Sequence, residues 1–134
     1  MKADFDNISF EDSYLLGWEK GIGTMVFSVE LLLTDRHRLF EPYDEESEHG
    51  CYKVGRIVVN GLMDITGLPC DKRELQWNSE MHEYADIAEI ESLTLSNGSH
   101  LRIETDEFTF EVSGKSINID FDLESPPVTV KGSE

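Results

Sequence analysis

The chain has 134 residues, of which 39% are hydrophobic, and a formal net charge of −17 at pH 7. This acidity argues against nucleic acid and anionic membranes as partners, because both require a basic surface. The remaining interpretations are that the charge attracts basic proteins or cations, or that it serves only solubility. Disorder requires low hydrophobicity as well as high charge, so we expect a single folded domain over residues 1–134.

Residues 1–7 contain no apolar segment of the signal-peptide kind, and no run of about eighteen apolar residues occurs in the chain. The sequence therefore predicts a cytoplasmic protein. Its two cysteines, Cys51 and Cys70, are too few for a disulfide framework, so we expect both to be reduced thiols. The sequence carries no indication of an oligomeric state.

The longest apolar run, residues 24–34, predicts a central β-strand rather than a helix, because it is rich in β-branched and aromatic residues and follows a glycine-containing turn. Its odd-numbered apolar positions share one face, which we expect to be core: Met25, Phe27, Val29, Leu31 and Leu33. Residues 13–19 predict a preceding strand with Tyr14, Leu16 and Trp18 on one face, joined to the central strand in a hairpin.

A polar stretch follows the central strand. Residues 41–50 form an acidic loop, with five carboxylates between positions 41 and 48 and a proline that disfavours regular structure. Residues 51–60 predict a strand, 62–68 a further short strand, and 71–86 a connection with at most one short helix.

The alternation of apolar residues in the last third predicts hairpins of definite register. Odd-numbered leucines on both sides of the first turn require a loop with an odd number of residues, so we expect residues 96–98 to form it and Leu93 to face Leu101. Tight turns at 106–107 and 114–115 predict these facing pairs: Ile103 with Phe110, Leu101 with Val112, Arg102 with Glu111, Val112 with Ile117, Phe110 with Ile119 and Phe108 with Phe121.

These hairpins make a four-stranded meander over residues 87–122, followed by a tail at 126–134. The apolar face of the meander and that of the strands within residues 13–60 can cover each other. The sequence therefore predicts a mainly β fold, an antiparallel β-sandwich or a strongly curved antiparallel sheet with meander hairpins and at most one short helix.

The residue types that carry chemistry occur without the spacing that chemistry requires. The histidines and cysteines lack zinc-ligand spacing, and the acidic loop lacks the alternating oxygen ligands and glycine turn of a calcium site. No nucleophile elbow and no glycine-rich phosphate loop is present. We expect no metal, no cofactor and no catalytic residues, and the abundant carboxylates leave an acid–base enzyme as an open alternative.

The acidic loop is the candidate site for a partner. An aromatic side chain among carboxylates is suited to binding a basic protein. The candidate partner-binding residues are Tyr43, Asp44, Glu45, Glu46 and Glu48. Residues 74–134 add 14 acidic against 3 basic residues, which would attract such a partner from a distance. A solvated loop without a function is the alternative interpretation.

Residues 10–15 (FEDSYL), 51–61 (CYKVGRIVVNG) and 84–95, with YADI and SLTL, together resemble small bacterial all-β proteins of uncharacterised function, some of which are similar to immunity proteins of polymorphic toxin systems. The resemblance implies a mostly β fold and an activity that consists of binding a cognate toxin, without catalytic residues. We therefore expect a non-catalytic acidic binding protein that neutralises a basic toxin, with a small cytoplasmic ligand-binding domain or an enzyme of unknown substrate as the alternative.

Overall fold

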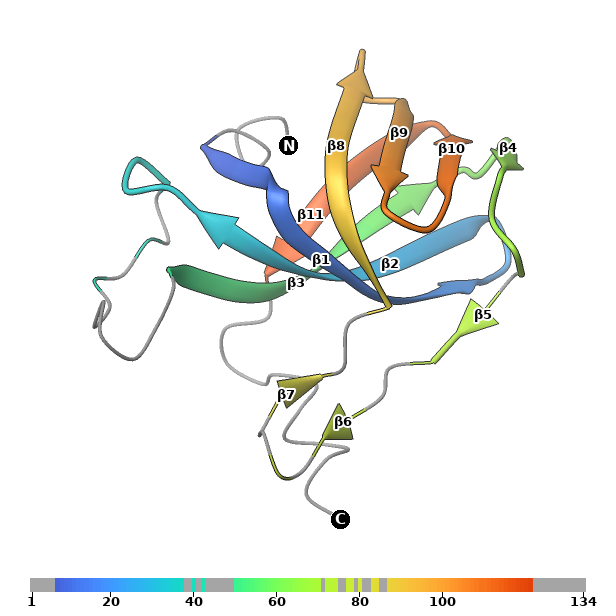
Figure 1. The fold of residues 1–134 in the computed structure, drawn as a ribbon. Helices are drawn as coiled ribbons and strands as arrows, with labels where there is room; N and C mark the ends of the chain where they lie inside the picture. The colour runs from blue at the N-terminus through green and yellow to red at the C-terminus, as the bar shows by residue number, and fades with distance from the viewer. Residues whose placement is uncertain are drawn as a thin grey trace.

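The fold is that of a computed structural model, which describes residues 7–37, 40, 42, 50–70, 72–74, 77–78, 80, 83–84 and 87–121. Throughout these residues the regular structure is β-strand, with no helix (Figure 1). The strands are β1 (Ile8–Lys20), β2 (Thr24–Leu33), β3 (Cys51–Asn60), β4 (Asp64–Thr66), β5 (Lys72–Arg73), β6 (Trp77–Asn78), β7 (Glu83–Tyr84), β8 (Ala88–Ser96), β9 (His100–Thr105), β10 (Thr109–Ser113) and β11 (Ser116–Phe121).

Nine of these strands form one antiparallel sheet, in the order β11-β3-β2-β1-β8-β9-β10-β4, with β5 attached to β1; β6 and β7 pair separately. The sheet curves onto itself. Phe27 of β2 and Phe110 of β10 stack with ring centroids 5.0 Å apart, although three strands separate β2 from β10 in the sheet. The two halves of the sheet therefore share one core, and the predicted mainly β fold with a strongly curved antiparallel sheet is confirmed.

β2 is an interior strand of this sheet, as its sequence predicts, and pairs with β1 and β3. Its alternation is complete, because every odd position is buried and every even position is partly exposed. The predicted strand over residues 51–60 and the short strand within 62–68 also occur, as β3 and β4. In the stretch 71–86 the described residues form the two-residue strands β5, β6 and β7.

An extra residue in β1 changes the predicted faces of its first half. Leu16 is inserted between two ladder pairs that β1 makes with β2. Alternation shifts at such a bulge. Tyr14 consequently lies opposite Glu30 on the outer face, whereas Trp18 lies opposite Phe27 on the core face. The prediction that Tyr14, Leu16 and Trp18 share one face was wrong.

The β9–β10 hairpin has the predicted register, with Ile103 opposite Phe110 and Arg102 opposite Glu111. The β8–β9 hairpin keeps the predicted faces but is shifted by two residues, so that Leu93 lies opposite Ile103 and not Leu101. The three loop residues are 97–99, because Asn97 and Gly98, both with positive φ, make the tight turn. An Asn-Gly pair provides that turn more readily than Ser96 and Asn97 would.

β11 does not continue the meander, so the three predicted pairs between residues 108–112 and 117–121 were wrong. Ile117 lies opposite Val59 and Ile119 opposite Ile57, both on β3. Gly114 marks the crossing between the two halves of the sheet, since a Cβ there would lie 2.6 Å from Val59 Cγ1. The glycine serves a close approach to β3, whereas the sequence suggested a hairpin turn. β10 pairs instead with β4.

Both cysteines are free thiols, Cys51 buried at the start of β3 and Cys70 exposed before β5. We expect Cys70 to react with a thiol reagent in the native protein and Cys51 to react only after unfolding, because reaction requires access to the sulfur. A titration of the native protein, followed by a second titration in denaturant, counts the thiols that react in each state. Equal native reactivity of the two thiols would contradict the burial of Cys51.

Candidate partner-binding surface

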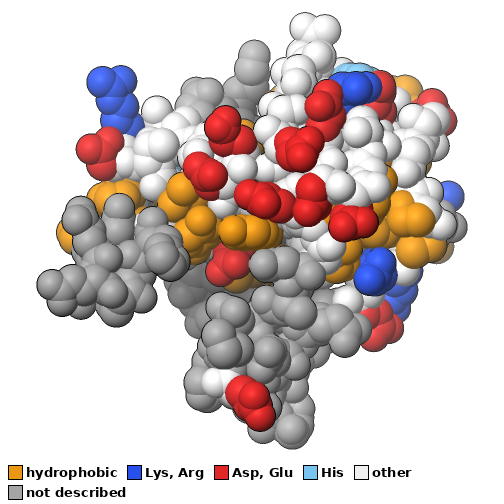
Figure 2. All heavy atoms as spheres, in the orientation of Figure 1, with side chains coloured by type: hydrophobic (Ala, Val, Ile, Leu, Met, Phe, Trp, Pro, Cys, Tyr) orange, Lys and Arg blue, Asp and Glu red, His pale blue; other side chains and the backbone are white. Residues whose placement is uncertain are grey.

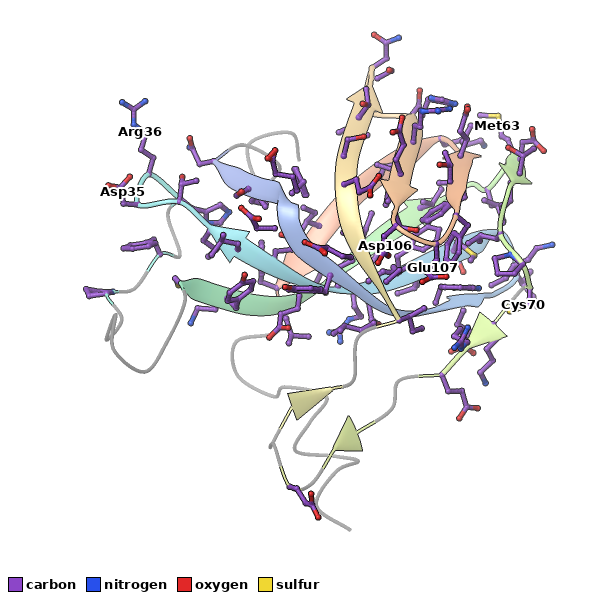
Figure 3. The ribbon with its side chains drawn as sticks, viewed as in Figure 1. Asp35, Arg36, Met63, Cys70, Asp106 and Glu107 are labelled. Atoms are coloured by element: carbon purple, nitrogen blue, oxygen red, sulfur yellow. The ribbon has the colours of Figure 1, made fainter. Side chains whose placement is uncertain are left out.

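The start of β8 and the β9–β10 turn, which are hydrogen-bonded to each other, carry four exposed carboxylates: Glu89, Glu91, Asp106 and Glu107, here called the acidic patch. Two hydrogen bonds hold the two segments together. The Glu89 amide donates to Asp106 Oδ1 at 3.0 Å, and the Asp106 amide donates to the Glu89 carbonyl oxygen at 3.0 Å. Figure 3 shows Asp106 and Glu107 at the end of the β9–β10 hairpin, beside β8. Residues 17 positions apart in sequence are thus neighbours on one surface.

Hydrogen bonds of the Thr105 hydroxyl hold the turn that carries Asp106 and Glu107. The Thr105 hydroxyl donates to the Phe108 carbonyl oxygen at 2.6 Å and accepts from the Phe108 amide at 2.9 Å and the Glu107 amide at 3.2 Å. Phe108 packs edge-on against Trp18 of the core, with ring centroids 5.7 Å apart. These contacts therefore fix the backbone conformation of the turn that carries the two carboxylates.

All four side chains of the acidic patch belong to exposed residues. No Lys or Arg of the described chain makes an ion pair with any of them. Acidic side chains form a band across the middle of the face in Figure 2, and the basic side chains in that view lie toward its margins. Uncompensated carboxylates on one surface attract basic side chains from solution.

The neighbouring carboxylates of the same face are already paired. Arg102 donates to Glu111 at 2.7 Å and to Glu104 at 3.1 Å, and His100 lies 2.9 Å from Glu111. The hydrogen bonds that Arg102 donates to Glu104 and Glu111 raise the pKa of Arg102 above its ordinary value. Arg102 therefore offsets part of the charge of Glu104 and Glu111, whereas the acidic patch has no basic counterpart among the described side chains.

The sequence-predicted partner site lies outside the described residues, since the set of Tyr43, Asp44, Glu45, Glu46 and Glu48 falls within the undescribed part of the acidic loop. That prediction stays a prediction. The excess of acidic residues over positions 74–134 does not by itself single out Glu89, Glu91, Asp106 and Glu107 as a group. The sequence predicted the turn at 106–107 that carries Asp106 and Glu107. It did not predict the hydrogen bonds of this turn to the start of β8, which place it beside the segment that carries Glu89 and Glu91.

Within the described ranges, no group of three or more His, Cys, Asp or Glu side chains is arranged to hold a metal ion. The same residues include no helix long and apolar enough to cross a membrane. No protein-family model, curated protein or solved structure matches this chain.

Proposed function

We propose that this protein acts without catalysis, by binding a basic protein partner, and that the acidic patch is its contact surface. The observation that carries the proposal is the preformed group of four exposed carboxylates, Glu89, Glu91, Asp106 and Glu107, without a basic counterpart among the described side chains. Opposite charge of this kind steers a partner during diffusional encounter and raises the rate of association.

The geometry of the patch supports specific binding in addition to steering. Its backbone is held by hydrogen bonds between β8 and the β9–β10 turn, so little conformational entropy is lost when a partner binds. Phe108 and Ile87, which lie next to the patch in the chain, are partly exposed apolar residues. An apolar contact beside complementary charge is a common arrangement at protein interfaces.

The proposal extends to the kind of partner. The sequence motifs quoted above resemble those of small bacterial all-β proteins, some of which are similar to immunity proteins, and the resemblance implies an activity that consists of binding a toxin. We therefore propose neutralisation of a basic toxin as the specific role, with Tyr43, Asp44, Glu45, Glu46 and Glu48 of the acidic loop as a second contact region. The net charge of −17 favours a partner with a strongly basic surface.

The test is the kinetics of association with the basic partner captured from the source cell. Replacing Glu89, Glu91, Asp106 and Glu107 by their amides should slow association roughly tenfold or more at low salt, because the steering field is lost. The dependence of the association rate on ionic strength should flatten. Thermal stability should change little, since the four side chains are exposed and make no ion pair with a described residue, and an amide oxygen at position 106 can still accept the hydrogen bond from the Glu89 amide.

Asp35→Asn is the matched control for a single change, because Asp35 is exposed but lies far from the patch, before Arg36 (Figure 3). It should leave association nearly unchanged, whereas Glu107→Gln should slow it. For the acidic loop, Glu45, Glu46 and Glu48 changed to Gln should slow association, and Tyr43→Ala should mainly speed dissociation. A complex indifferent to all of these changes would contradict the proposal and favour the alternative of a ligand-binding domain or enzyme.

A further inference from the structure

The edge of β8 that faces β1 is paired over only part of its length. β1 pairs with β8 at two positions, Tyr14 opposite Glu89 and Leu15 opposite Ala88. Beyond them the two strands diverge, and Figure 1 shows β8 rising away from the N-terminal half of β1. Among the described strands, residues 92–96 of β8 pair with β9 alone. The other side of this stretch is here called the open edge of β8.

Two leucines direct their backbone groups toward the open edge. At the end of the β8–β9 hairpin Ser96 pairs with His100, and the Ser96 carbonyl oxygen accepts a hydrogen bond from the Ser99 amide at 3.1 Å. Because successive residues of a strand turn their N–H and C=O groups to opposite sides, Leu93 and Leu95 turn theirs away from β9. Within the described chain, neither leucine pairs with β1 or with a turn or loop. The open edge therefore offers backbone donors and acceptors to another chain.

The sequence of the open edge lacks the features that prevent strand pairing. Residues 92–96 read Ser-Leu-Thr-Leu-Ser, without a charge or a proline, whereas natural edge strands commonly carry lysine or proline. The bulge of β8, at Glu91, lies before this stretch. Leu93 and Leu95 pack against the core but are only partly buried. A strand added here gains backbone hydrogen bonds and apolar contacts together.

Charge favours one kind of occupant for the open edge. Glu89 and Glu91 of the acidic patch lie on β8 itself, directly before the open stretch, and are exposed. Glu11 and Asp12 are exposed on the N-terminal half of β1, the strand from which β8 diverges. A second copy of this chain, with its net charge of −17, would be repelled, whereas a basic segment would be attracted. The open edge is also continuous with the acidic patch along β8.

We propose that an extended segment of the basic partner adds to the open edge of β8 as a further strand of the sheet. This inference rests on the proposed function and adds the mode of binding to it. The backbone of the segment forms hydrogen bonds with Leu93 and Leu95, and its apolar side chains pack on these two leucines. Alternate side chains of a strand point to the opposite face, where basic residues of the segment lie beside Glu91.

A short synthetic peptide of alternating lysine and valine, blocked at both ends, is the probe for this proposal. Titrated into the isotopically labelled full chain at low salt, it should bind saturably, shift the NMR signals of the Leu93 and Leu95 amides and slow their hydrogen exchange. The control is the same peptide with every backbone nitrogen methylated, which keeps the charges and side chains but removes the N–H donors. It should bind about tenfold more weakly or worse, because several hydrogen bonds are lost.

Thr94→Lys should also weaken binding of the unmodified peptide, because it places a positive charge at the exposed position between the two leucines. Thr66→Lys is the matched control, since Thr66 is exposed on β4, the strand at one end of the sheet, and this change should leave peptide affinity nearly unaltered.

Absence of peptide binding, binding without a change at the Leu93 and Leu95 amides, or equal weakening by the two lysine substitutions would overturn the proposal. Equal affinity of the two peptides would overturn strand addition while leaving charge attraction to the acidic patch intact. The proposed function itself is tested separately, by the association kinetics of the captured partner.

Discussion

Replacing Phe110 by alanine is expected to destabilise the protein by about 3–5 kcal/mol, the usual cost of truncating a fully buried phenylalanine. Phe110 is 1% exposed and stacks on Phe27 across the core, with ring centroids 5.0 Å apart. It joins the two halves of the curved sheet, so its loss removes contacts that no neighbouring strand replaces. Equilibrium unfolding in urea, followed by fluorescence, measures the change.

Ile22→Ala is the control for this experiment. Ile22 is an equally hydrophobic residue at the tip of the β1–β2 hairpin, with 102% relative exposure, so its replacement should change stability by less than about 0.5 kcal/mol. If both substitutions had similarly small effects, the two halves of the sheet would not share a core.

Replacing Gly67 by alanine is the second substitution with a large expected effect. Gly67 follows β4 with φ +94°, a conformation that side chains rarely adopt, and a Cβ there would clash with the Thr109 carbonyl oxygen and lie 2.9 Å from Phe110 Cα. Backbone strain costs roughly 1–2 kcal/mol and overpacking against backbone roughly 1–3 kcal/mol. The sum predicts a loss of about 2–5 kcal/mol, measurable by thermal or urea unfolding.

Gly98→Ala separates the two causes. Gly98 also has a positive φ, +71°, but a Cβ there would meet nothing within 4 Å. Only the cost of the backbone conformation should therefore appear, about 1–2 kcal/mol. Equal effects at the two positions would mean that β4 does not lie against β10 as closely as the structure has it.

The elements that were predicted correctly are those whose faces differ sharply in polarity. In the β9–β10 hairpin the apolar positions alternate without interruption, and strand, face and register follow from that alternation. In β2 every odd position is apolar and buried, although Val26 and Leu32 are apolar on the other face. Shifting a register by two residues leaves every side chain on its face. Alternation therefore could not distinguish Leu93 opposite Ile103 from Leu93 opposite Leu101.

For the same reason, the sequence could not predict which strand pairs with β11. Ile117 and Ile119 face the core whether the strand pairs with β10 or with β3, so polarity is satisfied by both arrangements. The choice depends on a non-local contact, the close approach of Gly114 to Val59, and a glycine in the sequence does not show whether it makes a turn or fits against a neighbour.

The candidate sites depend on non-local contacts even more strongly. The acidic patch requires the β9–β10 turn to bond to β8, and the cavity lined by Lys72 and Arg73 requires β5 to lie along β1. Residues 71–86 carry too weak an apolar pattern to predict the placement of β5. Composition predicted the sign of the overall charge, whereas the tertiary pairing decides which carboxylates share a surface.

Cross-linking of carboxylates to lysines is the most direct test of the central claim, that a basic protein binds at the acidic patch. The complex captured from the source cell is treated with a zero-length carbodiimide reagent, and the coupled residues are identified by mass spectrometry. We predict that lysines of the partner couple to Glu89, Glu91, Asp106 or Glu107. Coupling confined to other carboxylates, such as Glu19 and Glu74 at the cavity or Glu45 and Glu46 of the acidic loop, would contradict it.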